Sequence, residues 1–599
     1  MIQKFVSQFS GKEGPSRLSL LRAQMANEDV DAFLIPRSDA HQGEEVTDRD
    51  NRLSWLTGFT GSAGFCAVLR RTAGIFVDGR YRIQVKNETT SSFTPVDWPE
   101  TQLSDWLLDE LCDGDRVAFD PWLHTHQEIK RLRGQLKDAG IEMIPIDNLV
   151  DRIWTDQPTD PADPISIHPL EFSGENQINK RKRLSRTLRD TGIDAAVLTT
   201  LDSIAWLTNT RGSDLAHMPV AKSFAILYSD GSMQLFIDPQ KVTKEVEANL
   251  GEDTRIKPPN LFERTVAALQ GTVLIDPTLA PEAVWQALNR REDGEITLGA
   301  DPTSLPKACK NPIELSGAIA AHIRDGAAMV RFLHWLDGQD ATTLHEIDIV
   351  ERLEDIRSEN ALFNTISFDT ICGSGPNGAI IHYRVSKASN RQIRQDDILL
   401  VDSGAQYRDG TTDVTRTIAI GETTEDQRRA NTAVLKGMIA LSQQRFPEGV
   451  TGGQLDAIAR AGVWNMGLDY AHGTGHGVGS FLSVHEGPQR ISRTSNVPLE
   501  PGMILSNEPG YYQEGAFGIR IENLIYVVDS GKTSQSGARI YRFETLTLVP
   551  IDKALIEIDM LTDQERAWLN VYHQKVLNDV GSMVPADTRN WLALACAAI

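Results

Sequence analysis

Apolar and polar residues alternate in a helix–strand order that occurs twice in the first half of the chain. Residues 17–39 predict an amphipathic helix, a short turn and a buried strand, and residues 183–203 predict the same elements. The repetition predicts two tandem α/β domains, over 1–160 and 165–310. The alternative is convergent helix–strand patterning, which is common in unrelated proteins.

Tryptophan-containing segments follow both copies of this pattern, at 53–65 and at 204–215. Further β-like segments come next, at 73–84 and 223–238, so the similarity continues beyond the first helix and strand. The paired tryptophans therefore favour a duplication. A proline-rich stretch, 155–169, marks the predicted boundary between the two copies.

The pattern changes at about residue 310. Residues 310–336 and 341–360 have apolar positions at helical spacing, and glycine-punctuated strands follow to about residue 530. Residues 561–580 are helical again, and the apolar run 591–599 predicts a packed terminal helix. We therefore predict a third domain over 311–535 and a small C-terminal segment over 536–599.

Two aspartates lie in β-like runs of the third domain. Asp402 and Asp413 flank a segment whose Asp409-Gly410 pair predicts a hairpin. Exposure of both aspartates at strand ends is the simple interpretation. If they are buried, each needs a cationic partner, because an unpaired buried carboxylate costs several kcal/mol.

Three histidines lie close together in the glycine-rich segment 471–488, namely His472, His476 and His485. Glycines let the backbone approach closely and leave imidazoles free to point at a common centre. A phosphate-binding loop is the alternative, but the segment has no P-loop lysine and no GxxxxGK pattern.

Two glutamates complete the set of acidic candidates. Glu508 ends a predicted strand before Pro509-Gly510, and strand alternation over 518–528 places Arg520 and Glu522 on one face. If the four acids converge, their charge of −4 is balanced by two divalent ions. Carboxylates with one imidazole suit Mn²⁺, Co²⁺ or Zn²⁺, held about 3.5–4 Å apart around a shared water or hydroxide.

Composition excludes several other functions. The 599 residues include 60 basic and 82 acidic side chains, and this net charge of −22 should repel nucleic acid and anionic lipid. Five cysteines without CxxC spacing fit a reducing compartment. No apolar run is long enough to span a membrane, and the N-terminal residues lack the apolar core of a signal peptide. We therefore expect a cytoplasmic protein.

The ordered motifs resemble those of the pita-bread metallopeptidases, the family of methionine aminopeptidase, prolidase and aminopeptidase P. These motifs are two aspartates with ten residues between them, "HGTGHGVG", "SNEPGYY" and "RIEN". The tandem front domains, "TISFDTICGSGPNGAIIHYR" at 365–384 and "WLNVYH" at 568–573 are similar to the long, three-domain form. The resemblance implies two creatinase-like α/β domains, a pita-bread catalytic domain and a C-terminal extension.

The resemblance also implies a role for each candidate residue. The dinuclear metal ligands are expected to be Asp402, Asp413, His476, Glu508 and Glu522. Glu508 is also expected to move the proton of the attacking water, and Arg520 to orient a ligand carboxylate. His382, His472 and His485 are expected near the substrate, with His382 and His485 on the scissile carbonyl. Arg80, in the first domain, matches a substrate-binding residue of similar enzymes.

The expected function is that of a manganese-dependent exopeptidase that removes the first residue from peptides with proline at position two. Similar enzymes are dimers, so a homodimer is expected. A prolidase would share the five ligands but cleaves only dipeptides and usually lacks the duplicated front domains. Creatinase shares the fold without metal, and a peptidase-dead binding module would have lost ligands; the intact set argues against both.

Overall fold

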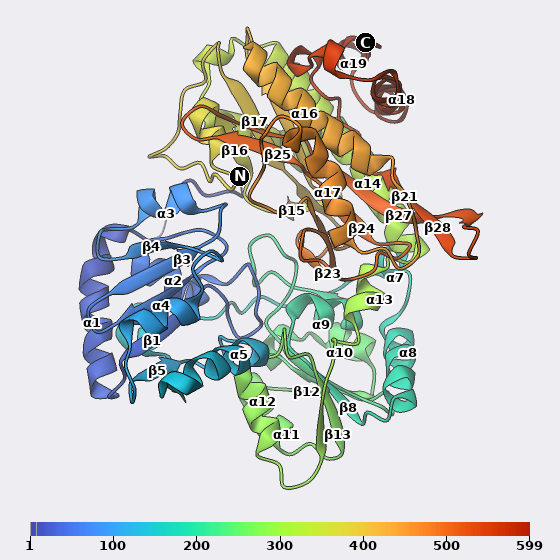
Figure 1. Cartoon of the computed structure of the whole chain (residues 1–599). Coiled ribbons are helices and arrows are strands. Elements are labelled where there is room, and N and C mark those ends of the chain that lie inside the picture. Colours follow the sequence, from blue (N-terminus) through green and yellow to red (C-terminus); the bar gives the residue numbers. More distant parts are fainter. Residues whose placement is uncertain (1, 7–8) are drawn as a thin grey trace. The chain divides into compact units, whose positions relative to one another are not determined.

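The computed structural model describes residues 2–6 and 9–599, which form two compact units. The N-terminal unit runs to Ser304 (Figure 1, blue to green). The C-terminal unit comprises Leu305–Ile599 and the N-terminal residues up to Val6. The predicted domain range 1–160 includes residues 1, 7 and 8, which lie outside the described residues.

The N-terminal unit contains two six-stranded sheets with the same topology. The first has the order β4-β3-β2-β1-β5-β6 and the second the order β12-β11-β10-β8-β13-β14, with matching parallel and antiparallel pairs. This agreement supports the predicted duplication. The strands are β1 (Ala32–Pro36), β2 (Phe65–Leu69), β3 (Ala73–Val77), β4 (Thr94–Asp97), β5 (Arg116–Phe119), β6 (Glu142–Pro145), β8 (Ala195–Leu198), β10 (Phe224–Tyr228), β11 (Met233–Phe236), β12 (Thr254–Lys257), β13 (Thr272–Ile275) and β14 (Glu295–Leu298).

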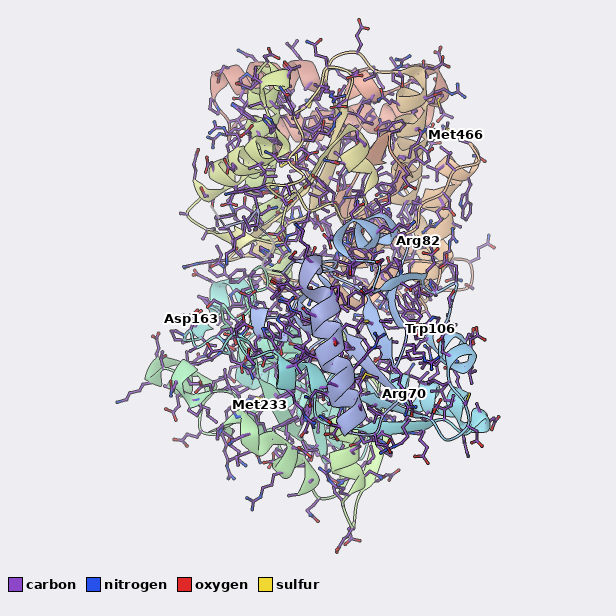
Figure 2. All side chains as sticks on the ribbon, turned by 90° about the vertical axis from the view of Figure 1, so that its left-hand side faces the viewer. Arg70, Arg82, Trp106, Asp163, Met233 and Met466 are labelled. Atoms are coloured by element: carbon purple, nitrogen blue, oxygen red, sulfur yellow. The ribbon has the colours of Figure 1, made fainter. Side chains whose placement is uncertain are left out.

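The first sheet is buried on both faces, which explains why β1 is apolar throughout. Phe33 and Ile35 pack in the cluster that contains α1 (Gly14–Asn27), whereas Leu34 packs in the cluster on the opposite face. On that second face lies Trp106 (labelled in Figure 2), whose ring packs at right angles to that of Phe76 with centroids 5.6 Å apart.

The C-terminal unit packs helices against antiparallel strands, most of which lie in two sheets. The helices are α14 (Pro312–Asp337), α15 (Glu346–Ser358), α16 (Glu425–Ser442), α17 (Gly452–Trp464), α18 (Asp563–Val580) and α19 (Ala586–Ala595). One three-stranded sheet has the order β16-β17-β20, and a six-stranded sheet has the order β21-β28-β27-β24-β22-β23. These strands are β16 (Ile371–Ser374), β17 (Ile398–Ser403), β20 (Val414–Ala419), β21 (Arg445–Pro447), β22 (Gly475–Gly477), β23 (Glu486–Ile491), β24 (Ile504–Asn507), β27 (Asn523–Thr533) and β28 (Arg539–Thr545).

The helices predicted over 310–336, 341–360 and 561–580 all form, and α14 begins with a capping box at Asn311 and Glu314. The terminal apolar run lies largely in α19, whose Leu592 is fully buried. Helices α16 and α17 approach closely at Gly437, where an added Cβ would lie 2.0 Å from the carbonyl oxygen of Ala459.

Two strand predictions have different outcomes. The hairpin predicted at Asp409-Gly410 forms between β18 (Ala405–Tyr407) and β19 (Gly410–Thr411). The single strand predicted over 518–528 is wrong. It divides into β26 (Phe517–Arg520), which pairs with β25 (Gly510–Gln513), and β27, which pairs with β24 and β28. The break falls at Ile521 and Glu522, where the chain leaves one sheet and enters another.

Candidate metal centre

The five predicted ligands come from strands or strand ends of the two sheets. Asp402 lies in β17 and Asp413 directly precedes β20, its antiparallel neighbour. His476 is the central residue of β22, and Glu508 directly follows β24, the adjacent strand. Glu522 directly precedes β27. Residues separated by up to 120 positions are thus placed on neighbouring strands.

The acidic residues are buried, so exposure at strand ends is the wrong interpretation. Asp402, Asp413 and Glu522 are 7%, 4% and 1% exposed. Each keeps one buried carboxylate oxygen that accepts no hydrogen bond from any described residue: Oδ1 of both aspartates and Oε1 of Glu522. Since buried polar atoms nearly always have a partner, these three oxygens are suited to bind a ligand such as a metal ion.

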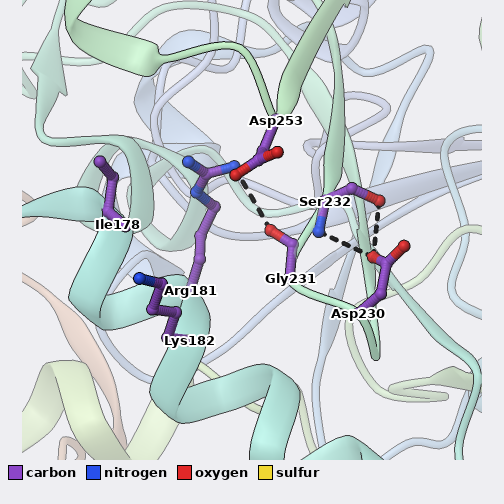
Figure 3. Close-up of a pocket in the computed structure, with 7 residues that line it drawn as sticks. All are labelled: Ile178, Arg181, Lys182, Asp230, Gly231, Ser232 and Asp253. Carbon is purple, nitrogen blue, oxygen red and sulfur yellow. Dashed lines mark hydrogen bonds between the residues drawn. The ribbon is translucent and has the colours of Figure 1, made fainter.

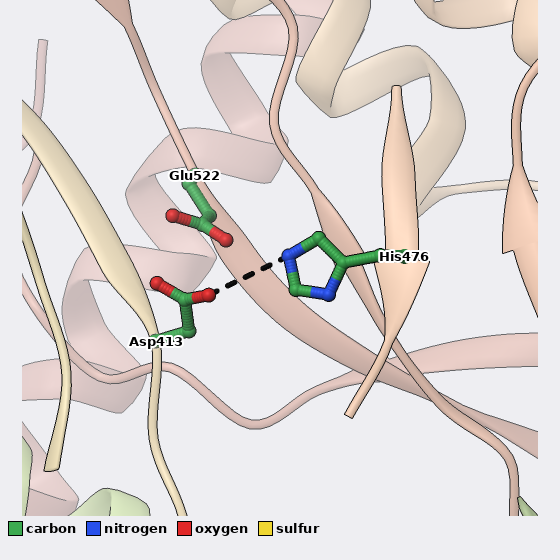
Figure 4. A group of neighbouring side chains, drawn as sticks. All are labelled: Asp413, His476 and Glu522. Carbon is green, nitrogen blue, oxygen red and sulfur yellow. Dashed lines mark ion pairs between the residues drawn. The ribbon is translucent and has the colours of Figure 1, made fainter. Parts of the chain in front are cut away.

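His476 lies among these carboxylates with one nitrogen directed at them (Figure 4). Its Nε2 lies 3.5 Å from an oxygen of Asp413 and 3.5 Å from one of Glu508. Its Nδ1 lies 2.9 Å from the carbonyl oxygen of Gly477, which can only accept. Nδ1 therefore carries the hydrogen, and in the neutral ring the lone pair of Nε2 faces the carboxylates, as a metal ligand requires.

Burial and the closeness of the acids to one another shift the pKa values of this cluster. Burial, reinforced by neighbouring Asp402 and Glu508, raises the pKa of Asp413 to about 6. Burial and the other three acids raise the pKa of Glu522 well above its usual range. Burial disfavours the His476 imidazolium, but Asp413 and Glu508 outweigh it and raise that pKa to about 9.

A divalent ion fits these residues. Ligand atoms of Asp413, His476 and Glu522 lie within 4.8 Å of one another, and hard carboxylate oxygens with one imidazole suit Mn²⁺, Co²⁺ or Zn²⁺. An ion would supply the partner that the orphan oxygens lack and would remove the need to protonate the cluster.

Arg520 connects this cluster to His472. Its Nη2 donates to Asp402 at 2.5 Å, and its Nη1 donates to the hydroxyl of Tyr512 at 2.7 Å. The Tyr512 hydroxyl lies 2.9 Å from Nε2 of His472, whose Nδ1 faces the carbonyl oxygen of Gly473. The hydrogen bond from Arg520 to Asp402 is compatible with the predicted role of Arg520, which is to orient a ligand carboxylate. We did not predict Tyr512; its position four residues after Glu508 was the only signal.

His485 and His382 approach the same region from two other segments. The ring of His485 lies 4.2 Å, centroid to centroid, from that of His476. His382 follows Ile381, whose carbonyl oxygen accepts a 3.4 Å hydrogen bond from Arg520. Thr415 is another residue that we did not predict: its hydroxyl donates to Glu522 at 2.8 Å and accepts from Arg520 at 3.2 Å.

Arg80 belongs to the N-terminal unit, where it forms a bidentate ion pair with Asp78. Its contact with substrate stays a prediction. The same unit has a small hollow of about 110 Å³ beside α8 (Gln177–Asp190), in which Arg181 faces the carbonyl of Gly231 (Figure 3). None of the predicted site residues lines it.

Comparison with known proteins gives the family. Residues 317–529 match the metallopeptidase family M24, and residues 17–153 and 156–314 match creatinase/prolidase N-terminal domains. Residues 539–599 match the C-terminal region of peptidase M24. The chain is 40% identical to a probable Xaa-Pro aminopeptidase P of Aspergillus fumigatus, over 97% of this chain and 92% of the relative. The chain belongs to the M24 metallopeptidases.

Two further proteins are similar to this chain over nearly its whole length. A probable Xaa-Pro aminopeptidase P of Paracoccidioides brasiliensis is 39% identical, over 96% of this chain and 98% of the relative. The solved X-prolyl aminopeptidase of Caenorhabditis elegans, described as a cytosolic enzyme with a di-nuclear active site, has a TM-score of 0.93 at 34% identity. The match covers 98% of this chain and 100% of that one, which confirms the predicted fold. Among the described residues, no helix combines the length and apolar character needed to cross a membrane.

Proposed function

We propose that this M24 enzyme is a manganese-dependent Xaa-Pro aminopeptidase that uses two divalent ions. One observation carries the proposal: ligand atoms of Asp413, His476 and Glu522 lie within 4.8 Å of one another, and Asp402, Asp413 and Glu522 each keep a buried oxygen that accepts no hydrogen bond from a described residue. Full-length similarity to proteins named Xaa-Pro aminopeptidase P supports this substrate class. We place the enzyme in the cytoplasm as a homodimer, as expected from its composition and its resemblance.

Asp402, Asp413, His476, Glu508 and Glu522 would hold two divalent ions, whose chemistry would be to lower the pKa of a bound water and to polarise the carbonyl under attack. Glu508 is the residue that takes and returns the proton. It is less buried than the other acids, with 18% of its side chain exposed, and its Oε1 accepts from Ser506 at 3.0 Å. This bond fixes one oxygen toward His476 and leaves the second oxygen for the water and then for the proline nitrogen.

The remaining residues bind and orient the peptide. His485 is exposed, and its ring lies beside that of His476. We assign to His485 and His382 the hydrogen bonds to the oxygen that becomes negative. His472 is held by Tyr512, which fixes the orientation of its ring. Arg80 keeps the substrate-binding role that the resemblance implies.

The experiment that tests this function compares three sets of peptides. Proline at position two has no amide N–H and a fixed φ, so general aminopeptidases cleave the preceding bond poorly. With Mn²⁺ present, we expect release of the first residue from X-Pro-Y peptides, slower release from X-Pro and almost none from X-Ala-Y. Cleavage confined to dipeptides would identify a prolidase instead. No cleavage of any peptide by metal-loaded protein would favour a peptide-binding module.

A further inference from the structure

Arg416 is a buried cation directly behind the metal centre. It lies in β20, three residues after Asp413, and is 2% exposed. Its guanidinium donates to six neutral oxygens: the carbonyls of Thr415 (2.8 Å), Glu522 (2.6 Å), Val549 (2.7 Å) and Pro550 (3.1 Å), the amide of Asn523 (2.8 Å) and the hydroxyl of Tyr572 (2.9 Å).

Among the described residues, none of the hydrogen-bond acceptors of this guanidinium is a carboxylate. A buried charge without an ionic partner is costly, so its retention needs a reason. Burial lowers the pKa of Arg416, whereas Tyr572 and Glu522 favour its charged form. Its six neutral hydrogen-bond acceptors therefore replace an ionic partner and fix the guanidinium in place.

On the metal side, Arg416 holds the backbone of Glu522 and that of Thr415, whose side chain binds the Glu522 carboxylate. Its Nη1 binds both the carbonyl of Glu522 and the carbonyl of Thr415. The amide of Glu522 donates to that same Thr415 carbonyl, and the Thr415 hydroxyl donates to Oε2 of Glu522. Oε1 of Glu522, the orphan oxygen, is thereby aimed by a set of bonds that converge on Arg416.

On the other side, Arg416 contacts the segment that follows the catalytic strands. Its Nη2 is bound by the Tyr572 hydroxyl and by the carbonyl of Val549. Tyr572 lies in α18, is 4% exposed, stacks on Trp568 and donates its own hydrogen to the Val549 carbonyl at 2.8 Å. The ring stacking and these bonds fix the Tyr572 hydroxyl as an acceptor for the guanidinium.

We propose that Arg416 and Tyr572 are positioning residues that hold Glu522 in its metal-binding conformation. The C-terminal segment matched over 539–599 then stabilises the metal centre through Arg416, although none of its residues is a predicted ligand. This inference rests on the proposed dinuclear function, because it assigns a role toward the ions that Glu522 would bind.

The test measures Mn²⁺ binding by titration calorimetry of the chelator-stripped full chain. Tyr572→Phe removes one hydroxyl and preserves the ring stack, so the fold should survive. Loss of such an outer partner typically weakens metal binding about 10–100-fold, and we expect that loss here. Arg416→Lys keeps the charge but cannot reach six acceptors, so it should lose at least as much. Val576→Ala is the matched control, because Val576 is a fully buried residue of the same helix that is not bonded to Arg416.

The control should lower Tm without changing the affinity for Mn²⁺. Wild-type affinity in both Tyr572→Phe and Arg416→Lys would overturn the proposal, as would an equal loss in Val576→Ala, which would reduce the effect to general destabilisation. The outcome is separable from the proposed function. If the wild type binds Mn²⁺ but cleaves no X-Pro-Y peptide, the peptidase assignment fails while the positioning role is still measured.

Discussion

The affinity of the centre for metal should depend steeply on pH, because protons and metal ions compete for the same atoms. In the metal-free protein the pKa of His476 is about 9 and that of Asp413 is about 6. Both groups must lose their protons to bind an ion. Affinity must therefore rise with pH.

The magnitude follows from these two values. Between pH 8 and pH 6, the fraction of His476 that is free of a proton falls about 100-fold, and Asp413 becomes about half protonated, a further factor of about 2. We expect Mn²⁺ to bind about 200-fold more weakly at pH 6 than at pH 8, or about 3 kcal/mol. The raised pKa of Glu522 acts in the same direction.

The assay is competition with a chelator of known affinity at pH 6, 7 and 8. His476→Gln is the control, since glutamine keeps a polar side chain that does not titrate. Its affinity should be lower, and it should change less with pH than that of the wild type, because only the carboxylates of the cluster then titrate. A wild-type affinity that changes less than about threefold between pH 6 and pH 8 would refute the reasoning that His476 must lose a proton before it binds metal.

Three further predictions concern catalysis and stability. Glu508→Gln should lower kcat at least about 100-fold, and near-normal turnover in metal-replete protein would remove its role in proton transfer. His382→Ala and His485→Ala should each lose about 10²–10³ in kcat at unchanged metal content; loss of metal instead would reassign them as ligands. Arg520→Met should lower the unfolding free energy of metal-free protein by about 3–5 kcal/mol, because it leaves Asp402 buried and unpaired; an unchanged urea midpoint would contradict this.

Local sequence patterns were enough to predict the kinds of element and the chemistry of the ligands. Apolar spacing was enough for α14, α15 and α18, because each helix buries one continuous face of a local segment. The duplicated front half was visible because both copies repeat one order of helix and strand. Asp402, Asp413 and His476 could be selected because charged residues inside apolar or glycine-rich strands require a partner.

Long-range packing determines which residues support those ligands, so local patterns could not identify them. The strand predicted over 518–528 breaks at Ile521 and Glu522, because its two halves pair with different sheets, and local alternation carries no information on pairing partners. Arg416 and Tyr572 are 156 positions apart and meet only when α18 packs behind β20. Their contact depends on long-range packing. In the sequence alone, Arg416 looks like an ordinary surface arginine and Tyr572 like an ordinary core tyrosine.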